Sequence, residues 1–89
     1  MIRLIDLMQD KSYPESGKLL YDILENAIKN NTTVEIDMTN VNSLPSMFLN
    51  ASFGNAFVIF GKDAIKGRIK FYHIGKSQAE RLSDYFLRY

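Results

Sequence analysis

The 89-residue chain contains no cysteine and no tryptophan, only one histidine and only two prolines. The absence of cysteine excludes a disulfide scaffold, a thiolate zinc site and a nucleophilic thiol. The single histidine, His73, has no nearby partners at a ligand-like spacing, so we expect neither a metal site nor a cofactor. Two prolines and five glycines are too few for an extensively disordered chain. We therefore expect one globular domain covering residues 1–89.

The chain also shows no signal for export or membrane insertion. Its start lacks the basic region, apolar stretch and small-residue cleavage site of a signal peptide. No run of about 18 apolar residues is available to cross a membrane. We expect a soluble protein, and the lack of cysteine is compatible with the cytoplasm.

The formal net charge is only +1, which gives no global attraction to nucleic acid. The charges are nevertheless uneven, because residues 62–89 carry seven positive and three negative side chains. A basic cluster consists of Lys62, Lys66, Arg68 and Lys70. It is interpreted either as a solvated loop and strand edge or as a docking patch for an acidic partner. Nucleic-acid or nucleotide binding through this segment is the alternative function.

No charged residue occurs between Asp37 and Lys62, although 24% of the chain is charged. This segment predicts a loop followed by a helix from Met47 to Phe60, with Ser46 as its N-cap and Gly61 as its end. On a helical projection, one face is a stripe suited to the core: Leu49, Phe53, Ala56, Phe57 and Phe60.

A second face of that helix is apolar but small, whereas a helix that covers a sheet normally has a charged outer face. Two alternatives stay open. The helix is buried on both sides within the monomer, or this face meets a protein partner or a second copy of the chain. We predict that this face meets a protein partner or another copy of the chain. The contact surface would be formed by Met47, Asn50, Ala51, Gly54 and Val58.

The remaining chain alternates between strand and helix signals. Strands are expected over residues 2–8, 32–38 and 68–74. A helix is expected to begin between Glu15 and Lys18 and to end at Asn30-Asn31. The last helix is expected to start with a capping box, Ser77 to Glu80. This β-α-β-α-β-α order predicts an α/β fold with a small, mainly parallel or mixed sheet and helices packed on it.

The segment VEIDMTNVNSLPSMFLNASFGNAF, residues 34–57, resembles the core of the STAS-like domain family. Ile36-Asp37, Val41, Ser46-Met47-Phe48-Leu49 and NASFGNAF carry the resemblance, and SGKLLYDIL resembles the family's first helix. This small bacterial family has no assigned function and is related in design to anti-sigma factor antagonists. The resemblance implies a STAS-like fold and a histidine-kinase-like ATPase as a binding partner.

In anti-sigma factor antagonists, a serine at the start of this helix is phosphorylated by that partner, and Ser46 matches its position. The match has departures, because Pro45 replaces the usual acidic residue and Met47-Phe48 replaces Ser-Gly. The resemblance thus implies a phosphorylation switch at Ser46, and the plain alternative is a helix N-cap.

The sequence contains few candidate catalytic residues. Asp37 and His73 are the residues on which an enzyme would have to be built, but Asp37 is better explained as a loop organiser. Tyr85, Phe86 and Tyr89 are either a terminal anchor for a partner or ordinary core residues. We predict a non-enzymatic protein-interaction or regulatory module.

Overall fold

Three parallel strands form a sheet in which they follow their order in the chain: β1 (Ile2–Arg3), β2 (Val34–Asp37) and β3 (Ile69–Tyr72). β2 is the middle strand, and its register with β3 runs from Val34 opposite Ile69 to Asp37 opposite Tyr72. The computed structural model describes all 89 residues. The predicted α/β class and the mainly parallel sheet are confirmed.

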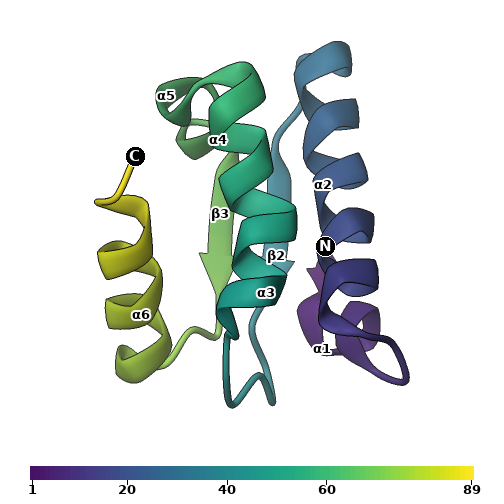
Figure 1. Cartoon of the computed structure of the whole chain (residues 1–89), viewed down its shortest axis with the longest axis vertical. Coiled ribbons are helices and arrows are strands. Elements are labelled where there is room, and N and C mark those ends of the chain that lie inside the picture. The colour runs from purple at the N-terminus through teal and green to yellow at the C-terminus, as the bar shows by residue number, and fades with distance from the viewer.

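The helices are α1 (Leu4–Met8), α2 (Tyr13–Asn30), α3 (Ser46–Leu49), the π-helical turn η1 (Asn50–Gly54), α4 (Asn55–Phe60), α5 (Lys62–Lys66) and α6 (Lys76–Phe86). The larger helices lie on one side of β2 and β3 (Figure 1). β2 alternates accordingly: Val34 and Ile36 are buried, while Glu35 is partly exposed. None of the helices is long and apolar enough to span a membrane.

Local signals explain the ends of α2. The Ser12 side chain accepts a hydrogen bond from the Glu15 amide (3.2 Å), and Pro14 stands in the first turn. Asn31 ends the helix in the left-handed conformation, with φ 54°. The predicted end is thus confirmed, but the start lies before the expected window because Ser12 is the cap.

The strand expected over residues 2–8 is wrong beyond Arg3. Arg3 already pairs with Asp37, the last residue of β2, so the following residues have no strand to pair with. They form α1 instead, and Leu4 is buried in the core. The segment after Gly61 was also expected to be a loop, but it forms the short helix α5.

The capping box expected at Ser77 is also absent. α6 begins at Lys76, with Gly75 as its N-cap, and no side chain caps it. The Gly75 carbonyl already accepts the Ala79 amide (2.9 Å), which places Ser77 inside the first turn. The helix therefore starts before the serine that was expected to cap it.

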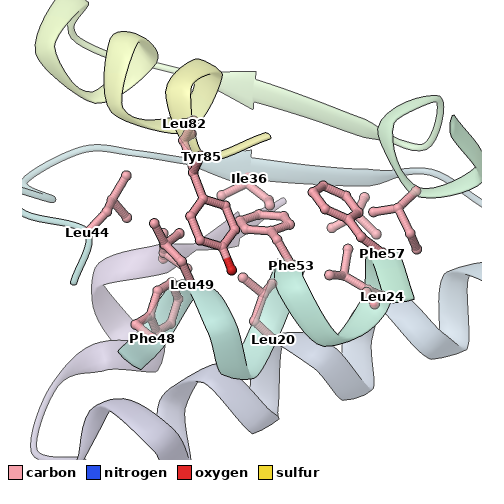
Figure 2. Close-up of a cluster of buried hydrophobic side chains, with 14 of the residues drawn as sticks. Leu20, Leu24, Ile36, Leu44, Phe48, Leu49, Phe53, Phe57, Leu82 and Tyr85 are labelled. Carbon is pink, nitrogen blue, oxygen red and sulfur yellow. The ribbon is translucent and has the colours of Figure 1, made fainter. Parts of the chain in front are cut away.

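The core contains 17 buried apolar residues. It lies between the sheet and three helical units, which are α2, the segment Ser46–Phe60 and α6. Figure 2 shows Phe48, Leu49, Phe53 and Phe57 pointing inward from the helical segment formed by α3, η1 and α4, with Leu20 and Leu24 coming from α2. Phe86 closes the α6 side, with ring centroids 5.3 Å from Phe53 and 5.0 Å from Phe57, both edge to face. The core stripe predicted for the helix over residues 47–60 is confirmed, with Phe60 partly buried at its end.

Candidate functional site

The uncharged segment folds into one continuous helix, formed by α3, η1 and α4, which we call the central helix (Ser46–Phe60). Its middle widens into the π-helical turn over Asn50–Gly54. The buried Ser52 hydroxyl donates to the Phe48 carbonyl (2.8 Å) within this region. Such turns shift the helical register and often occur at functional sites. Here the turn coincides with the closest contacts to both neighbouring helices.

On the side of α2, the central helix meets a glycine. A Cβ placed on Gly17 would lie 2.6 Å from the Ala51 Cβ and 2.8 Å from the Phe48 carbonyl oxygen. Only a residue without a side chain permits this approach. Ala51 is consequently half-buried against α2 and is not available as the open contact residue that the sequence predicted.

On the side of α6, Gly54 is buried beneath two tyrosines. A Cβ on Gly54 would collide with the Tyr85 hydroxyl and would lie 2.7 Å from the Tyr89 hydroxyl. Tyr85 donates to the Asn50 side-chain oxygen (2.6 Å), which leaves Tyr89 to donate to Tyr85 across 3.0 Å. Burial raises the pKa of Tyr85 well above its ordinary value.

The prediction that Gly54 belongs to an open contact face is therefore wrong. The groups that cover Gly54 are the hydroxyls of a tyrosine pair of the same chain. The two alternatives for these C-terminal tyrosines, an anchor for a partner or ordinary core residues, apply differently to each. Tyr85 is 1% exposed and belongs to the core, whereas Tyr89 is partly open.

What remains open on the central helix is a line of exposed, uncharged residues, which we call the outer ridge: Met47, Asn50, Asn55, Val58 and Ile59. Its apolar members are unusually accessible, since Met47 is 59%, Val58 75% and Ile59 61% exposed. Three of the five predicted contact residues, Met47, Asn50 and Val58, are thus on the surface. Ile59, which was not among the predicted contact residues, joins them on the surface.

Ser46 lies at the first turn of the central helix, next to the outer ridge. Its hydroxyl does not cap the helix, so the N-cap interpretation is wrong; the Pro45 carbonyl accepts the Leu49 amide (3.0 Å) instead. The exposed Ser46 hydroxyl accepts a hydrogen bond from Arg81 of α6 (3.0 Å). Arg81 also donates to the Leu44 carbonyl (3.1 Å), which holds the guanidinium beside the serine.

Asp37 and His73 come together at the carboxyl ends of β2 and β3, with 3.0 Å between carboxylate and ring nitrogen. The same Asp37 oxygen accepts bonds from the Thr39 hydroxyl (2.6 Å) and the Thr39 amide (2.9 Å). These bonds to Thr39, and then the one to His73, lower the pKa of Asp37 to about 2. Asp37 therefore organises the loop after β2, as predicted.

This pair shows no sign of a substrate site. His73 is exposed, and neither residue lines any of the hollows in the molecule. No group of three or more histidine, cysteine, aspartate or glutamate side chains is arranged to hold a metal ion.

The four basic residues of the predicted patch do not share one surface. Arg68 donates to the Thr32 carbonyl and the Asn31 side chain, which ties it to the turn before β2. Lys70 points to the sheet face opposite Phe71, because side chains alternate along a strand. Only Lys62 and Lys66 remain together, one turn apart on α5 and beside the same hollow.

A family model described as a STAS-like domain of unknown function matches residues 16–79. The chain belongs to this STAS-like family. The matched region runs from α2 into α6 and includes the whole uncharged segment, the central helix and the outer ridge. The resemblance seen in the sequence is thereby confirmed. No curated protein and no solved structure matches the chain.

Proposed function

We propose that this STAS-like domain is a non-enzymatic interaction module that binds a protein partner through the outer ridge. The observation that carries the proposal is the exposure of Met47, Val58 and Ile59 on a helix without a single charge. These three exposed apolar residues share one helix with the exposed Asn50 and Asn55, and apolar surface rimmed by polar residues is typical of interaction sites. Protein interfaces are depleted in charged residues at their centre and enriched in methionine.

The resemblance to anti-sigma factor antagonists suggests the kind of partner, a histidine-kinase-like ATPase. Ser46 would be the regulated position. Phosphorylation would add nearly two negative charges beside Met47, at the start of a helix that has no charged residue of its own. Arg81, 3.0 Å from the hydroxyl, and the start of the central helix would stabilise the phosphate. The phosphorylated form would then present a charged end of the ridge and bind its partner more weakly.

The proposal is tested by placing a photo-crosslinking amino acid at Val58 and, as a matched control, at Leu19. Leu19 is a surface leucine of α2 outside the outer ridge. Crosslinked products from cells are identified by mass spectrometry. We expect Val58, and not Leu19, to crosslink to one partner, with unlabelled protein competing and Met47→Glu protein failing to compete. Two results would show that the outer ridge is not the interface. One is equal crosslinking from both positions, and the other is Met47→Glu protein that competes as well as the unlabelled parent does.

The regulatory part is tested separately with the purified partner. Ser46→Asp should weaken binding at least tenfold, while Ser46→Ala should bind as the parent does. Incubation with the partner and ATP should place phosphate on Ser46, as measured by mass spectrometry. An unmodified Ser46, with Ser46→Asp binding normally, would contradict the switch and leave the ridge proposal standing.

A further inference from the structure

A second apolar surface of the molecule is concave. A hollow of about 370 Å³ lies between α5, the end of β3 and α6, and we call it the α5–α6 hollow. Its size falls within the range of small-molecule sites, which begins at about 300 Å³. Two-thirds of its lining residues are apolar, and they come from β3, the turn after it and α6: Phe71, Ile74, Ala79, Leu82, Phe86 and Leu87.

The charged residues that line this hollow are both positive. Lys62 and Lys66 line it together with Ser83, and no acidic side chain does. The Lys62 ammonium donates to the Tyr89 main-chain carbonyl (3.2 Å), which holds it near the hollow. Lys66 forms no ion pair with a carboxylate side chain, and Lys62 is bonded only to the main chain of Tyr89. The exposed Lys66 charge is therefore available to a ligand, with the Lys62 charge on the same short helix.

We propose that the α5–α6 hollow binds a small amphipathic carboxylate, such as a medium-chain fatty acid. The apolar body would lie against Phe71, Leu82 and Phe86. The carboxylate would lie between Lys62 and Lys66, where two ammonium groups offer charge-assisted hydrogen bonds. Apolar walls with a few placed polar groups are the usual design of a small-ligand site.

The charge of the hollow selects among possible occupants. A neutral apolar molecule would gain no attraction from the two ammonium groups, and a cation would be repelled by them. A single carboxylate matches both lysines at once. The site shares no lining residue with the outer ridge, so this inference is independent of the proposed function.

The test uses sodium decanoate and the full chain, with binding measured by calorimetry and by amide NMR shifts. Ala79 and Ala64 are both exposed helical alanines, but only Ala79 lines the hollow. Ala79→Phe fills the hollow and should abolish decanoate binding, whereas Ala64→Phe should bind as the parent does. Circular dichroism and the unfolding midpoint check that both variants are folded.

The lysines are tested with the pair Lys62→Gln/Lys66→Gln against a control pair, Lys11→Gln/Lys70→Gln, outside the hollow. The first pair should weaken decanoate binding about tenfold and leave the weaker binding of 1-decanol unchanged, because only the acid carries a charge. Three results would overturn the proposal: no decanoate binding up to about 1 mM, binding that Ala79→Phe does not reduce, or equal effects of the two lysine pairs.

Discussion

The two sides of the central helix differ sharply, although its sequence is apolar or small on both. Toward α2 and α6, Ala51 and Gly54 lie in contacts so close that no additional atom fits. Toward solvent, Met47 and Val58 contact little and are largely exposed. Ala51 and Gly54 thus serve the packing of the fold, whereas Met47 and Val58 lie on the surface that we propose for binding. Substitutions on the two sides should separate these two roles.

The largest effect is expected at Gly54. Gly54→Leu would drive a side chain into the Tyr85 and Tyr89 hydroxyls, which are held by hydrogen bonds. Overpacking of this kind costs about 3 kcal/mol, a large part of the stability of a small domain. Chemical denaturation measures the change, and Val58→Leu on the exposed side is the matched control, expected within about 0.5 kcal/mol of the parent. Equal stability of the two variants would disprove the contrast.

A smaller loss is expected at Gly17, on the other side of the same helix. Gly17→Ala places a methyl group against the Ala51 Cβ and the Phe48 carbonyl, at a cost of about 2 kcal/mol. The control is Gly67→Ala, whose added Cβ would meet only the Asp63 carbonyl at 3.4 Å. Ala51→Gly should recover part of the loss in the Gly17→Ala background, because it removes one of the two colliding groups. Additive losses in the double variant would refute this contact.

The third effect concerns the tyrosine pair. Tyr85→Phe removes the bond to Asn50 and should destabilise the fold by about 1 kcal/mol. The pair should also make stability depend on alkaline pH. Since the folded-state pKa of Tyr85 is raised above its ordinary value, its contribution is complete below about pH 10 and is lost as the pH rises further. Unfolding curves between pH 8 and 11 should therefore decline more steeply for the parent than for Tyr85→Phe, and parallel curves would contradict the assignment.

The sequence predicts much of this architecture because the decisive interactions are local. The end of α2 at Asn31, the position of β2 and the core face of the central helix all follow from spacing and residue type. The single parallel sheet follows from strands that alternate with helices. The STAS-like family was also recognisable from the segment around Asp37 and Ser46.

The predictions fail where residues distant in the sequence determine the local structure. Gly54 is covered by Tyr85 and Tyr89, which lie more than thirty residues later in the chain. The π-helical turn also shifts the register of the helix, which a regular projection does not include. The first strand stops at Arg3 because β2 ends at its partner, Asp37. The α5–α6 hollow joins three elements, and the only sequence signal for it is the spacing of Lys62 and Lys66.

The central claim is that the exposed side of the central helix serves binding and not stability. Val58→Glu tests it most directly when unfolding free energy and partner binding are measured on the same preparation. We predict stability within about 0.5 kcal/mol of the parent, together with at least a tenfold loss of binding to the partner captured through Val58. Unchanged binding by a folded Val58→Glu protein would contradict the account.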